Sequence, residues 1–231
     1  MDSLGVKKSR KDRILDAALR IFAEKGFQET TISEISKEAG VSEATIYEHF
    51  GTKEDLLFAI PPKITDERIA EMERMLPFFK GSEAKLRALL RGFIDLYENT
   101  PDYSALLLLQ LVPNKRFRQT ESYVSVRRAP HILMDVIKDG IKDGTFKKDS
   151  NARLIHSMLL GTIENLFIRW HLKGAPRNKE TIMDLLDPIL DIVLNGSRAR
   201  NNEEDLTIRL HVEGALKGLI VPEKNVKRKK G

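Results

Sequence analysis

The sequence predicts an all-α fold, with a three-helix N-terminal domain followed by a larger helical domain, about nine helices. Apolar residues recur at helical spacing along most of the chain, and glycine or proline stands where those helices should end. No alternating strand pattern of useful length and no internal repeat is present in the sequence. We therefore divide the chain into residues 1–53, residues 54–196 and a C-terminal extension at 197–231.

The composition is that of an ordinary globular protein. The 231 residues can bury a sizeable core, and 41% of them are hydrophobic. The absence of cysteine excludes disulfides and thiol catalysis and favours a cytoplasmic location. The N-terminus lacks the apolar core of a signal peptide, and no apolar run is long enough to span a bilayer, so we expect no membrane partner. The net charge of +5 does not argue for nucleic-acid binding, because residues 1–53 hold as many acidic as basic side chains.

Residues 31–56 predict two short helices joined by a tight turn, with a third helix directly behind them. Thr31 and Glu34 have the spacing of a capping box at the start of the first helix. Gly40 can adopt the left-handed conformation that ends a helix sharply. Ser42 is a fresh N-cap for the second helix. Local signals therefore mark both ends of the first helix and the start of the second.

The second of these helices has a face that packing does not require. That face carries Glu43, Ala44, Thr45, Tyr47, Glu48 and His49. Small and hydrogen-bonding side chains suit a helix that lies in the major groove of DNA, which is the helix-turn-helix pattern. The alternative is an ordinary αα-hairpin with a solvated polar face.

Basic residues gather upstream of this motif. The N-terminal arm carries Lys7, Lys8, Arg10, Lys11 and Arg13, which can neutralise phosphates. An amphipathic helix is predicted over residues 10–25, and Gly26 should end it. Lys53 lies at the start of the helix behind the motif, where free backbone N–H groups favour phosphate; simple exposure is the alternative.

The run AGVSEATIYEHFGTKEDLL resembles the DNA-binding signature of the TetR family of bacterial transcriptional repressors. The preceding ILDAALRIFAEKGFQETTISEISKEAG resembles that family's first helix and the start of its motif. The resemblance covers about residues 10–57. It implies a homodimer that binds a near-palindromic operator and is released by a small molecule, with a ligand-binding and dimerisation domain at 54–196. It assigns DNA contacts to Thr31, Ser42, Glu43, Ala44, Thr45, Tyr47, His49 and Lys53.

Pro61 and Pro62 interrupt the fourth helix. The second proline lacks a backbone donor and its ring would strike the carbonyl of Phe58, so we expect a kink or break near Ile60. In the TetR family this helix links the ligand domain to the DNA-reading domain. Two interpretations stay open: a hinge, or a bend around the core.

Further helices are predicted at 82–98, 103–112 (short and fully buried), 121–144, 151–172 and 179–194. The last two are apolar over more than one face, which predicts a partner surface. The resemblance implies that these two helices form a four-helix bundle in a homodimer. Packing within one protomer is the alternative. The polar and basic residues 197–231 predict either partial disorder or an additional contact with the dimer or with DNA.

A small-molecule pocket is predicted from aromatic residues and a few polar ones: Phe93, Tyr97, Phe117, Asn165, Arg169 and Trp170. Asn165 and Arg169 are favoured, because they lie four apart on an otherwise apolar helix. For each residue a core or surface role is the alternative. The apolar helices and the basic loop residues Lys115, Arg116 and Arg118 are compatible with an acyl-CoA or another hydrophobic ligand.

No arrangement typical of an enzyme is present in the sequence. It contains no HExxH, no G-x-S-x-G, no GxGxxG and no P-loop. His131 and Asp135, four apart, are two ligands at most and do not make a metal site. We predict no enzymatic activity, no metal and no cofactor. The competing hypothesis is a small-molecule-binding helical protein or enzyme whose hairpin never meets DNA. An activator or a nucleoid factor of the same fold is a third possibility.

Overall fold

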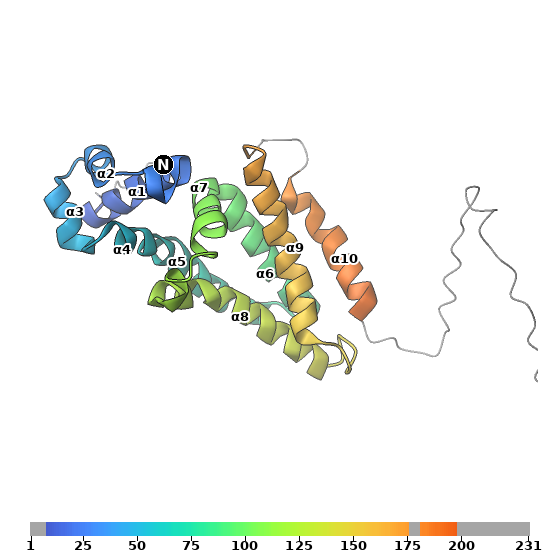
Figure 1. The fold of residues 1–231 in the computed structure, drawn as a ribbon. Coiled ribbons are helices and arrows are strands. Elements are labelled where there is room, and N and C mark those ends of the chain that lie inside the picture. The colour runs from blue at the N-terminus through green and yellow to red at the C-terminus, as the bar shows by residue number, and fades with distance from the viewer. Residues whose placement is uncertain (1–7, 176–180, 198–231) are drawn as a thin grey trace, which may run out of the picture. The chain divides into compact units, whose positions relative to one another are not determined.

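The computed structural model of the protein describes residues 8–175 and 181–197, which contain helices and no β-strand (Figure 1). The α-helices in order are α1 (Arg10–Glu29), α2 (Ile32–Ala39), α3 (Glu43–Phe50), α4 (Lys53–Phe58), α5 (Ile60–Met75), α6 (Ser82–Asn99), α7 (Pro101–Ala105), α8 (Glu121–Lys142), α9 (Ala152–Leu172) and α10 (Leu186–Ser197). Shorter turns are η1 (Leu76–Phe78), η2 (Leu106–Leu111), η3 (Phe117–Gln119) and η4 (Ile182–Leu185). The all-α prediction is confirmed.

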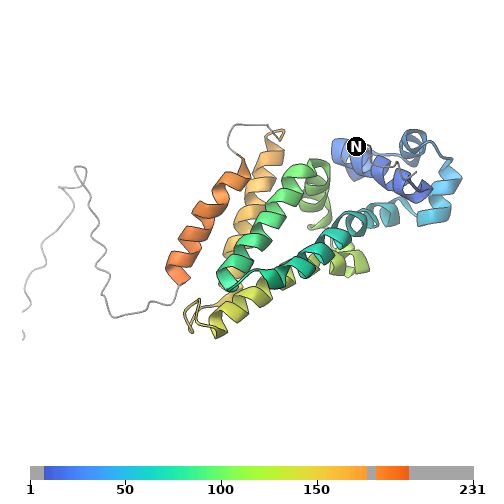
Figure 2. The ribbon, with the colours of Figure 1, turned by 180° about the vertical axis from the view of Figure 1, so that it is seen from behind.

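Helices α1, α2 and α3 are the three helices predicted at the N-terminal end of the chain, and α4 follows directly behind them (Figure 2). Both halves of the capping box at Thr31 are present, and Gly40 is left-handed with φ of 64°. Ile35 and Ile46, from the inward faces of α2 and α3, are fully buried; α2 packs against α1, and α3 packs against α2 and α4. Gly26 has φ of 80° and a non-helical ψ, so the regular part of α1 ends there, as predicted.

The expected break near Ile60 is confirmed. Helix α4 ends at Phe58, a single residue intervenes, and α5 begins at Ile60. Pro61 and Pro62 then occupy the first turn of α5. The N–H groups of a first turn have no partner within the helix, so the lack of an N–H in proline costs no hydrogen bond there. The carbonyl of Pro61 accepts a 3.0 Å hydrogen bond from the buried Thr65 hydroxyl. The prolines therefore start a helix here and do not deform one.

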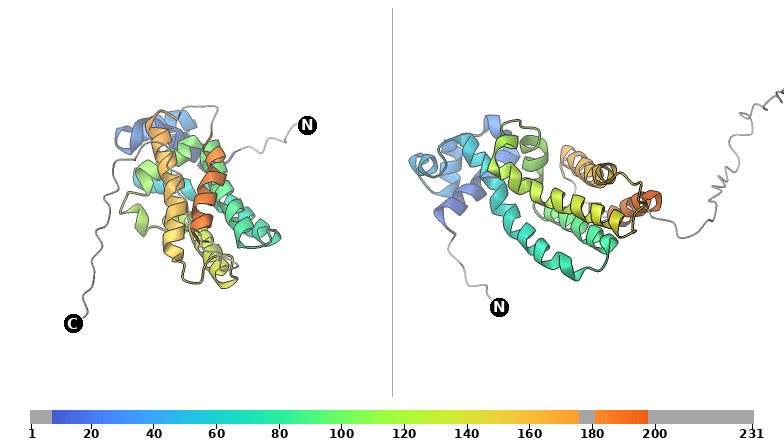
Figure 3. Two further views of the ribbon diagram at one scale, coloured as in Figure 1. Left: turned by 90° about the vertical axis from the view of Figure 1, so that its right-hand side faces the viewer. Right: turned by 90° about the horizontal axis from the view of Figure 1, so that it is seen from below.

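The remaining helices enclose a second core. Helices α5 and α6 both pack along α8, which also packs against α9, and α10 lies beside α9 (Figure 3). Leu86, Ile94, Leu133 and Ile163 are completely buried at the centre of these contacts. The predicted division of the chain at residue 53 stays a prediction.

The segment predicted as a buried helix over 103–112 differs in two ways. It begins at Pro101, and only five residues are α-helical before η2, which is a π-helical turn. Because this turn is wider than an α-helical one, the N–H of Val112 donates to the carbonyl of Leu107, five residues back, at 2.8 Å. Leu109 points outward and is 39% exposed, so the expectation of full burial was wrong.

The last helix also differs from its predicted bounds of 179–194. Its described part starts with η4, and α10 begins at Leu186, two residues before Pro188. A proline is tolerated only in the first turn of a helix, so the regular helix cannot begin much earlier. At the other end α10 continues through Gly196 to Ser197, past the stop expected at Asn195. The extension at 198–231 lies outside the described residues, so neither interpretation of it is tested.

Candidate functional site

One face of α3 is open to solvent. Its residues Ser42, Glu43, Ala44, Tyr47, Glu48 and His49 are exposed and Thr45 is half-buried, whereas Ile46 and Phe50 anchor the other side of the helix in the core. Tyr47 is the largest exposed side chain of this face, with 49% of its surface accessible. The free face expected from the sequence is therefore present. Side chains on this face can contact the major groove of DNA while the buried side of α3 stays packed in the core.

Two hydroxyls of the predicted set hold the helices in place. Ser42 Oγ accepts a 3.1 Å hydrogen bond from the Thr45 N–H and lies 2.9 Å from the Thr45 hydroxyl. Thr31 Oγ1 accepts from the Glu34 N–H at 3.2 Å and donates to Glu34 Oε2 at 3.0 Å. These caps satisfy otherwise free N–H groups at the starts of α3 and α2. Ser42 and Thr31 thus position the motif whether or not they also touch a ligand.

The basic arm is partly engaged within the protein. Lys8 forms a 2.7 Å ion pair with Asp16, and Arg13 Nη1 donates to the carbonyl of Ala39 at 3.2 Å. Arg10 and Lys11 remain exposed at the start of α1. Lys7, the other arm residue, lies outside the described residues.

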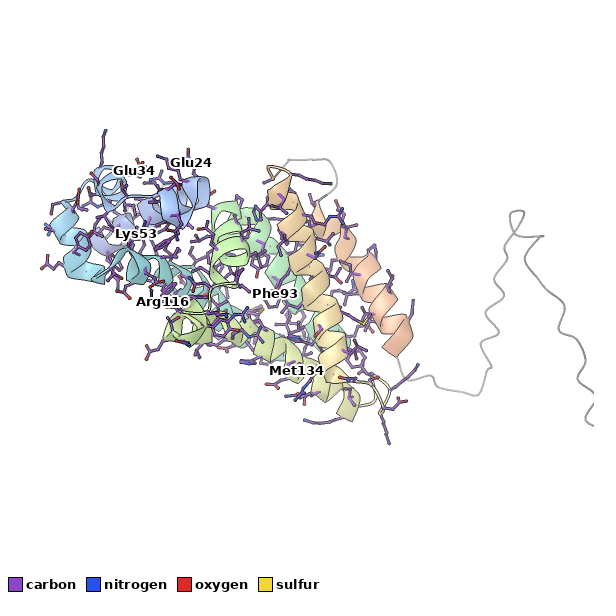
Figure 4. All side chains as sticks on the ribbon, in the orientation of Figure 1. Glu24, Glu34, Lys53, Phe93, Arg116 and Met134 are labelled. Carbon is purple, nitrogen blue, oxygen red and sulfur yellow. The ribbon has the colours of Figure 1, made fainter. Side chains whose placement is uncertain are left out.

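Lys53 is held against the end of α1 (Figure 4). Its Nζ donates to the carbonyls of Phe27 and Thr30, both at 2.8 Å, and lies 4.5 Å from the centre of the Phe27 ring. The sequence suggested a phosphate contact for this ammonium group. The structure gives it an internal role, tying the start of α4 to the end of α1.

A cavity of about 390 Å³ lies between α5, α6, η2 and α8, with α9 contributing to its wall. Most of its lining is apolar or aromatic, including Ile69, Met72, Phe93, Leu107, Tyr123 and Val126. Its size and apolar character match small-molecule sites. Arg68 and Asp95, which pair at 3.6 Å across α5 and α6, are half-exposed parts of the same lining.

Two of the six residues predicted to bind ligand line this cavity: Phe93 and Tyr97. Figure 4 shows Phe93 among the helices of the second core. Phe117 is completely buried behind Tyr123, with ring centres 5.7 Å apart. Trp170 is half-buried behind Phe167, at 5.8 Å. Neither of these two rings belongs to the lining.

The two favoured polar residues, Asn165 and Arg169, are exposed on the outer side of α9 and do not line the cavity. The sequence prediction failed here because α9 is apolar on both sides, so composition alone did not show which side faces inward. Glu164 is the polar residue of α9 that does line the cavity. Its spacing from the buried Leu160 and Phe167, at i−4 and i+3, is the signal that could have found it.

The polar lining of the cavity includes the phenols of Tyr97, Tyr103 and Tyr123, the guanidinium of Arg127 and the carboxyl of Glu164. Tyr103, which sequence reasoning missed, is completely buried, and its hydroxyl has no hydrogen-bond partner among the described residues. Burial raises the pKa of Tyr97 and of Tyr103, so both stay neutral at neutral pH. Burial also raises the pKa of the Glu164 carboxyl, and the nearby Arg127 partly opposes this.

Both halves of the chain match a known family. Residues 14–60 match the family described as "Bacterial regulatory proteins, tetR family", and residues 66–196, more than half of the chain, match "YsiA-like protein, C-terminal region". The chain belongs to the tetR family of bacterial regulatory proteins. The resemblance stated from the sequence is confirmed, and the chain is a transcriptional regulator that binds DNA through a helix-turn-helix.

Similar proteins of this tetR family are themselves regulators. The fatty acid metabolism regulator protein of Bacillus subtilis (strain 168) is 26% identical over 191 residues, which cover 82% of this chain and 96% of that protein. The HTH-type transcriptional repressor KstR2 of Rhodococcus jostii (strain RHA1) is 28% identical over 206 residues, covering 87% and 97%. The solved structure of FadR from Bacillus subtilis in complex with stearoyl-CoA has a TM-score of 0.72, with 26% identity, and the match covers 80% of this chain and 97% of that one.

In this tetR-family chain, Gln110 joins the cavity wall to the helix-turn-helix domain. Its Nε2 donates to the carbonyl of Phe22 and its Oε1 accepts from the N–H of Phe27, both at 3.0 Å. These two groups flank the break of α1 at Gly26. Gln110 lies in η2, the same π-helical turn that contributes Leu107 to the cavity wall.

A line of aromatic rings makes a second connection. Tyr123 lines the cavity, its ring packs on Phe117, and Phe117 packs on Phe58 of α4 with ring centres 5.4 Å apart. Nearby, Arg116 and Glu54 form a 2.7 Å ion pair, but Arg116 is 78% exposed and such pairs contribute little. The structure thus replaces the ligand role expected for Phe117 with a packing role between the cavity wall and α4.

No metal site is evident over residues 8–175 and 181–197, where no three carboxylate or histidine side chains come together. In that same part of the chain, no helix has the length and apolar character needed to cross a membrane. The matched proteins of the family are transcriptional regulators, and the absence of enzymatic activity stays a prediction.

Proposed function

We propose that the chain is a homodimeric repressor that binds a near-palindromic operator and leaves it when a largely apolar small molecule occupies the cavity. The observation that carries this proposal is the joint presence of an open face on α3 and of a cavity whose wall is connected to α1 through Gln110 and to α4 through Phe117. A protein that only stored or carried a small molecule would need neither connection.

On DNA, α3 would enter the major groove, one helical turn from its twin in the partner subunit. Thr45 and Tyr47 contact bases or phosphates, Ser42 and Ala44 approach the groove at the start of the helix, and Thr31 and His49 lie near the backbone. Glu43 limits the sequence that can be read, because its carboxylate repels phosphate and can accept a hydrogen bond only from a base such as cytosine. Lys53 would have to release two carbonyls to reach a phosphate.

The homodimer would form through the helices at 151–172 and 179–194. Exposed apolar side chains support this: Leu154 on α9 is 58% exposed, Met158 42%, Leu172 74%, and Ile192 on α10 is 72% exposed. Exposed apolar side chains gathered on two neighbouring helices favour a partner. The tetR membership of the chain favours a second copy as that partner.

An acyl-CoA or another hydrophobic ligand is the effector class that the cavity supports. The lining is dominated by apolar and aromatic side chains, and the similar FadR of Bacillus subtilis has been solved with stearoyl-CoA. An effector can weaken operator binding only as far as it binds the DNA-free arrangement better than the DNA-bound one. The contacts at Gln110 and Phe117 are the routes by which the cavity would bias that choice.

The test starts with selection of duplexes from a random library by the full chain at low salt. Retention should fall steeply as salt rises, because phosphate contacts release counterions. In a gel-shift titration on a selected duplex, Tyr47→Ala should lose about tenfold in affinity, the value of one good base contact, with unchanged size-exclusion elution.

Three outcomes would count against parts of the proposal. If the protein retains no duplex at any salt concentration, the competing hypothesis is favoured, in which the helical hairpin does not bind DNA. Unchanged operator binding by Tyr47→Ala would contradict the proposal that α3 contacts the major groove. If saturating stearoyl-CoA leaves the wild-type complex intact, the acyl-CoA class is wrong.

A further inference from the structure

The cavity contains a hydrogen-bonding group that the protein itself leaves unused. The Tyr103 side chain is completely buried, and its hydroxyl neither donates to nor accepts from any described residue. A buried polar group without a partner is costly, and native proteins rarely keep one without a reason. Tyr103 belongs to the cavity lining, so a molecule in the cavity can reach this hydroxyl.

The neighbours of Tyr103 restrict what that molecule can present. Tyr97 and Glu164 line the same cavity; the charge of Glu164 acts on Tyr97, whereas Tyr97 and the charge of Asp66 act on Tyr103. Glu164 forms no ion pair among the described residues, although Arg127, which also lines the cavity, partly offsets its charge. A carboxylate or phosphate of the ligand beside Tyr103 would be repelled by Asp66 and, next to Tyr97, by Glu164. The ligand group next to Tyr103 is therefore not anionic.

Two other arrangements fit less well. A quaternary ammonium group could meet Glu164 and the aromatic rings, but it offers nothing to a phenolic hydroxyl, so Tyr103 would stay unpaired. The thioester carbonyl of an acyl-CoA could accept from the hydroxyl, but only if the large, polyanionic CoA were also drawn inside, beside Glu164. An oxygen elsewhere on the ligand meets neither objection.

We propose that the cavity takes a ligand that is apolar over most of its length and carries a neutral carbonyl or hydroxyl oxygen at its buried end, hydrogen-bonded to Tyr103. This inference rests on the proposed function and narrows its effector from any hydrophobic molecule to an oxygenated one. Tyr103 acts as the specificity-determining residue, and Tyr97 and Glu164 keep the inner end polar. A ligand that ends in a plain hydrocarbon would leave the Tyr103 hydroxyl unpaired on binding. Such a ligand should bind more weakly, because a site built to form a hydrogen bond disfavours an analogue that lacks the bonding group.

The variant that isolates this role is Tyr103→Phe, which removes the hydroxyl and keeps the ring. Without ligand, its melting temperature should equal or exceed that of the wild type, because an unpaired buried group is lost. Isothermal titration calorimetry should then compare ω-hydroxystearoyl-CoA with stearoyl-CoA, and the same pair at several shorter chain lengths. The wild type should prefer the hydroxylated member of at least one pair by about tenfold, the value of one hydrogen bond. Tyr103→Phe should abolish that preference.

Tyr123→Phe is the matched control, since it deletes a hydroxyl from a less buried tyrosine of the same cavity, and it should keep the preference. The proposal is overturned if Tyr103→Phe lowers the melting temperature of the ligand-free protein, if the wild type binds both members of every pair equally, or if both variants lose the preference alike. None of these measurements uses DNA. A failure here is therefore distinguishable from a failure of operator retention, which would count against the proposed function itself.

Discussion

Three hydrogen bonds converge on the carboxylate of Glu34, at the start of α2. Lys25 Nζ donates at 2.5 Å, the Thr31 N–H at 2.9 Å and the Thr31 hydroxyl at 3.0 Å. These donors, Lys25 first, lower the pKa of Glu34 from 4.5 to about 2. One side chain thus caps α2 and ties it to α1, so it fixes the scaffold on which α3 is presented.

This arrangement predicts an acid limit for the helix-turn-helix. A carboxyl whose pKa is lower in the folded than in the unfolded chain stabilises the fold above its unfolded pKa, here about 4.5, and loses that contribution as the pH falls towards 2. Glu34→Gln should therefore lower the melting temperature at pH 7. The difference from the wild type should shrink steadily below pH 4.5.

Thermal melts followed by circular dichroism at several pH values would measure this effect. Glu24→Gln is the matched control: Glu24 is exposed on α1, next to Lys25, and takes part in no ion pair or helix cap within residues 8–175 and 181–197 (Figure 4). It should melt like the wild type throughout. A Glu34→Gln deficit that is the same at pH 7 and at pH 3 would show that the charge of Glu34 does not act as described.

At the scale of elements, the π-helical turn η2 connects the two halves of the molecule. Its wider turn lets four leucines face the core while Gln110 reaches the end of α1. Single π-helical turns are frequent at functional sites, because they place side chains where an α-helix cannot. A ligand that displaces Leu107 would move the same turn that holds Gln110.

Gln110→Leu should uncouple the cavity from the helix-turn-helix domain. The change removes both hydrogen bonds that join Gln110 to the end of α1, at a cost of about 1–3 kcal/mol in the free energy of unfolding. Operator affinity without ligand should change by less than about threefold, since α3 itself is untouched. The weakening of operator binding by stearoyl-CoA, measured by fluorescence anisotropy, should be much reduced.

Arg116→Gln is the comparison for this variant. It breaks the exposed ion pair to Glu54, which also spans the two halves of the chain, and should leave the ligand response intact. A Gln110→Leu protein that still responds to stearoyl-CoA like the wild type would move the coupling route to the rings of Phe58 and Phe117.

These elements also show how far sequence reasoning reaches. Helices α2 and α3 were predicted with their caps because the signals are local, as at Thr31 and Gly40. The π-helical turn has no such signal, since a run of leucines fits an α-helix equally well. The side of α9 that faces the cavity was missed because both of its sides are apolar, and the inward bonds of Lys53 depend on a residue 26 positions away.

At the scale of the whole molecule, the pair α9 and α10 carries apolar side chains that the rest of the described chain does not cover. Helices α9 and α10 lie side by side (Figure 3) and expose Leu154, Met158, Leu172 and Ile192. Repressors of the helix-turn-helix type bind two half-sites, so the spacing of the two reading heads depends on how the subunits pair. In the proposed homodimer, the stability of that pairing would therefore limit operator affinity.

The double variant Met158→Glu, Ile192→Glu should dissociate the dimer. Each change places a carboxylate in an apolar contact. Because a two-fold axis would relate the two subunits, each substitution would occur twice in the interface. The free energy of dimerisation should therefore weaken by about 3 kcal/mol or more, which raises the dissociation constant of the dimer at least about a hundredfold. Folding of the protomer should be little affected, because both side chains are largely exposed within it. Analytical ultracentrifugation and a gel shift on one and two half-sites would follow both effects, with binding to the full operator falling to that of a single half-site. Val124→Glu is the control, because Val124 is an apolar residue of α8 that is 65% exposed, and this variant should stay dimeric. A double variant that also stays dimeric would place the partner surface elsewhere.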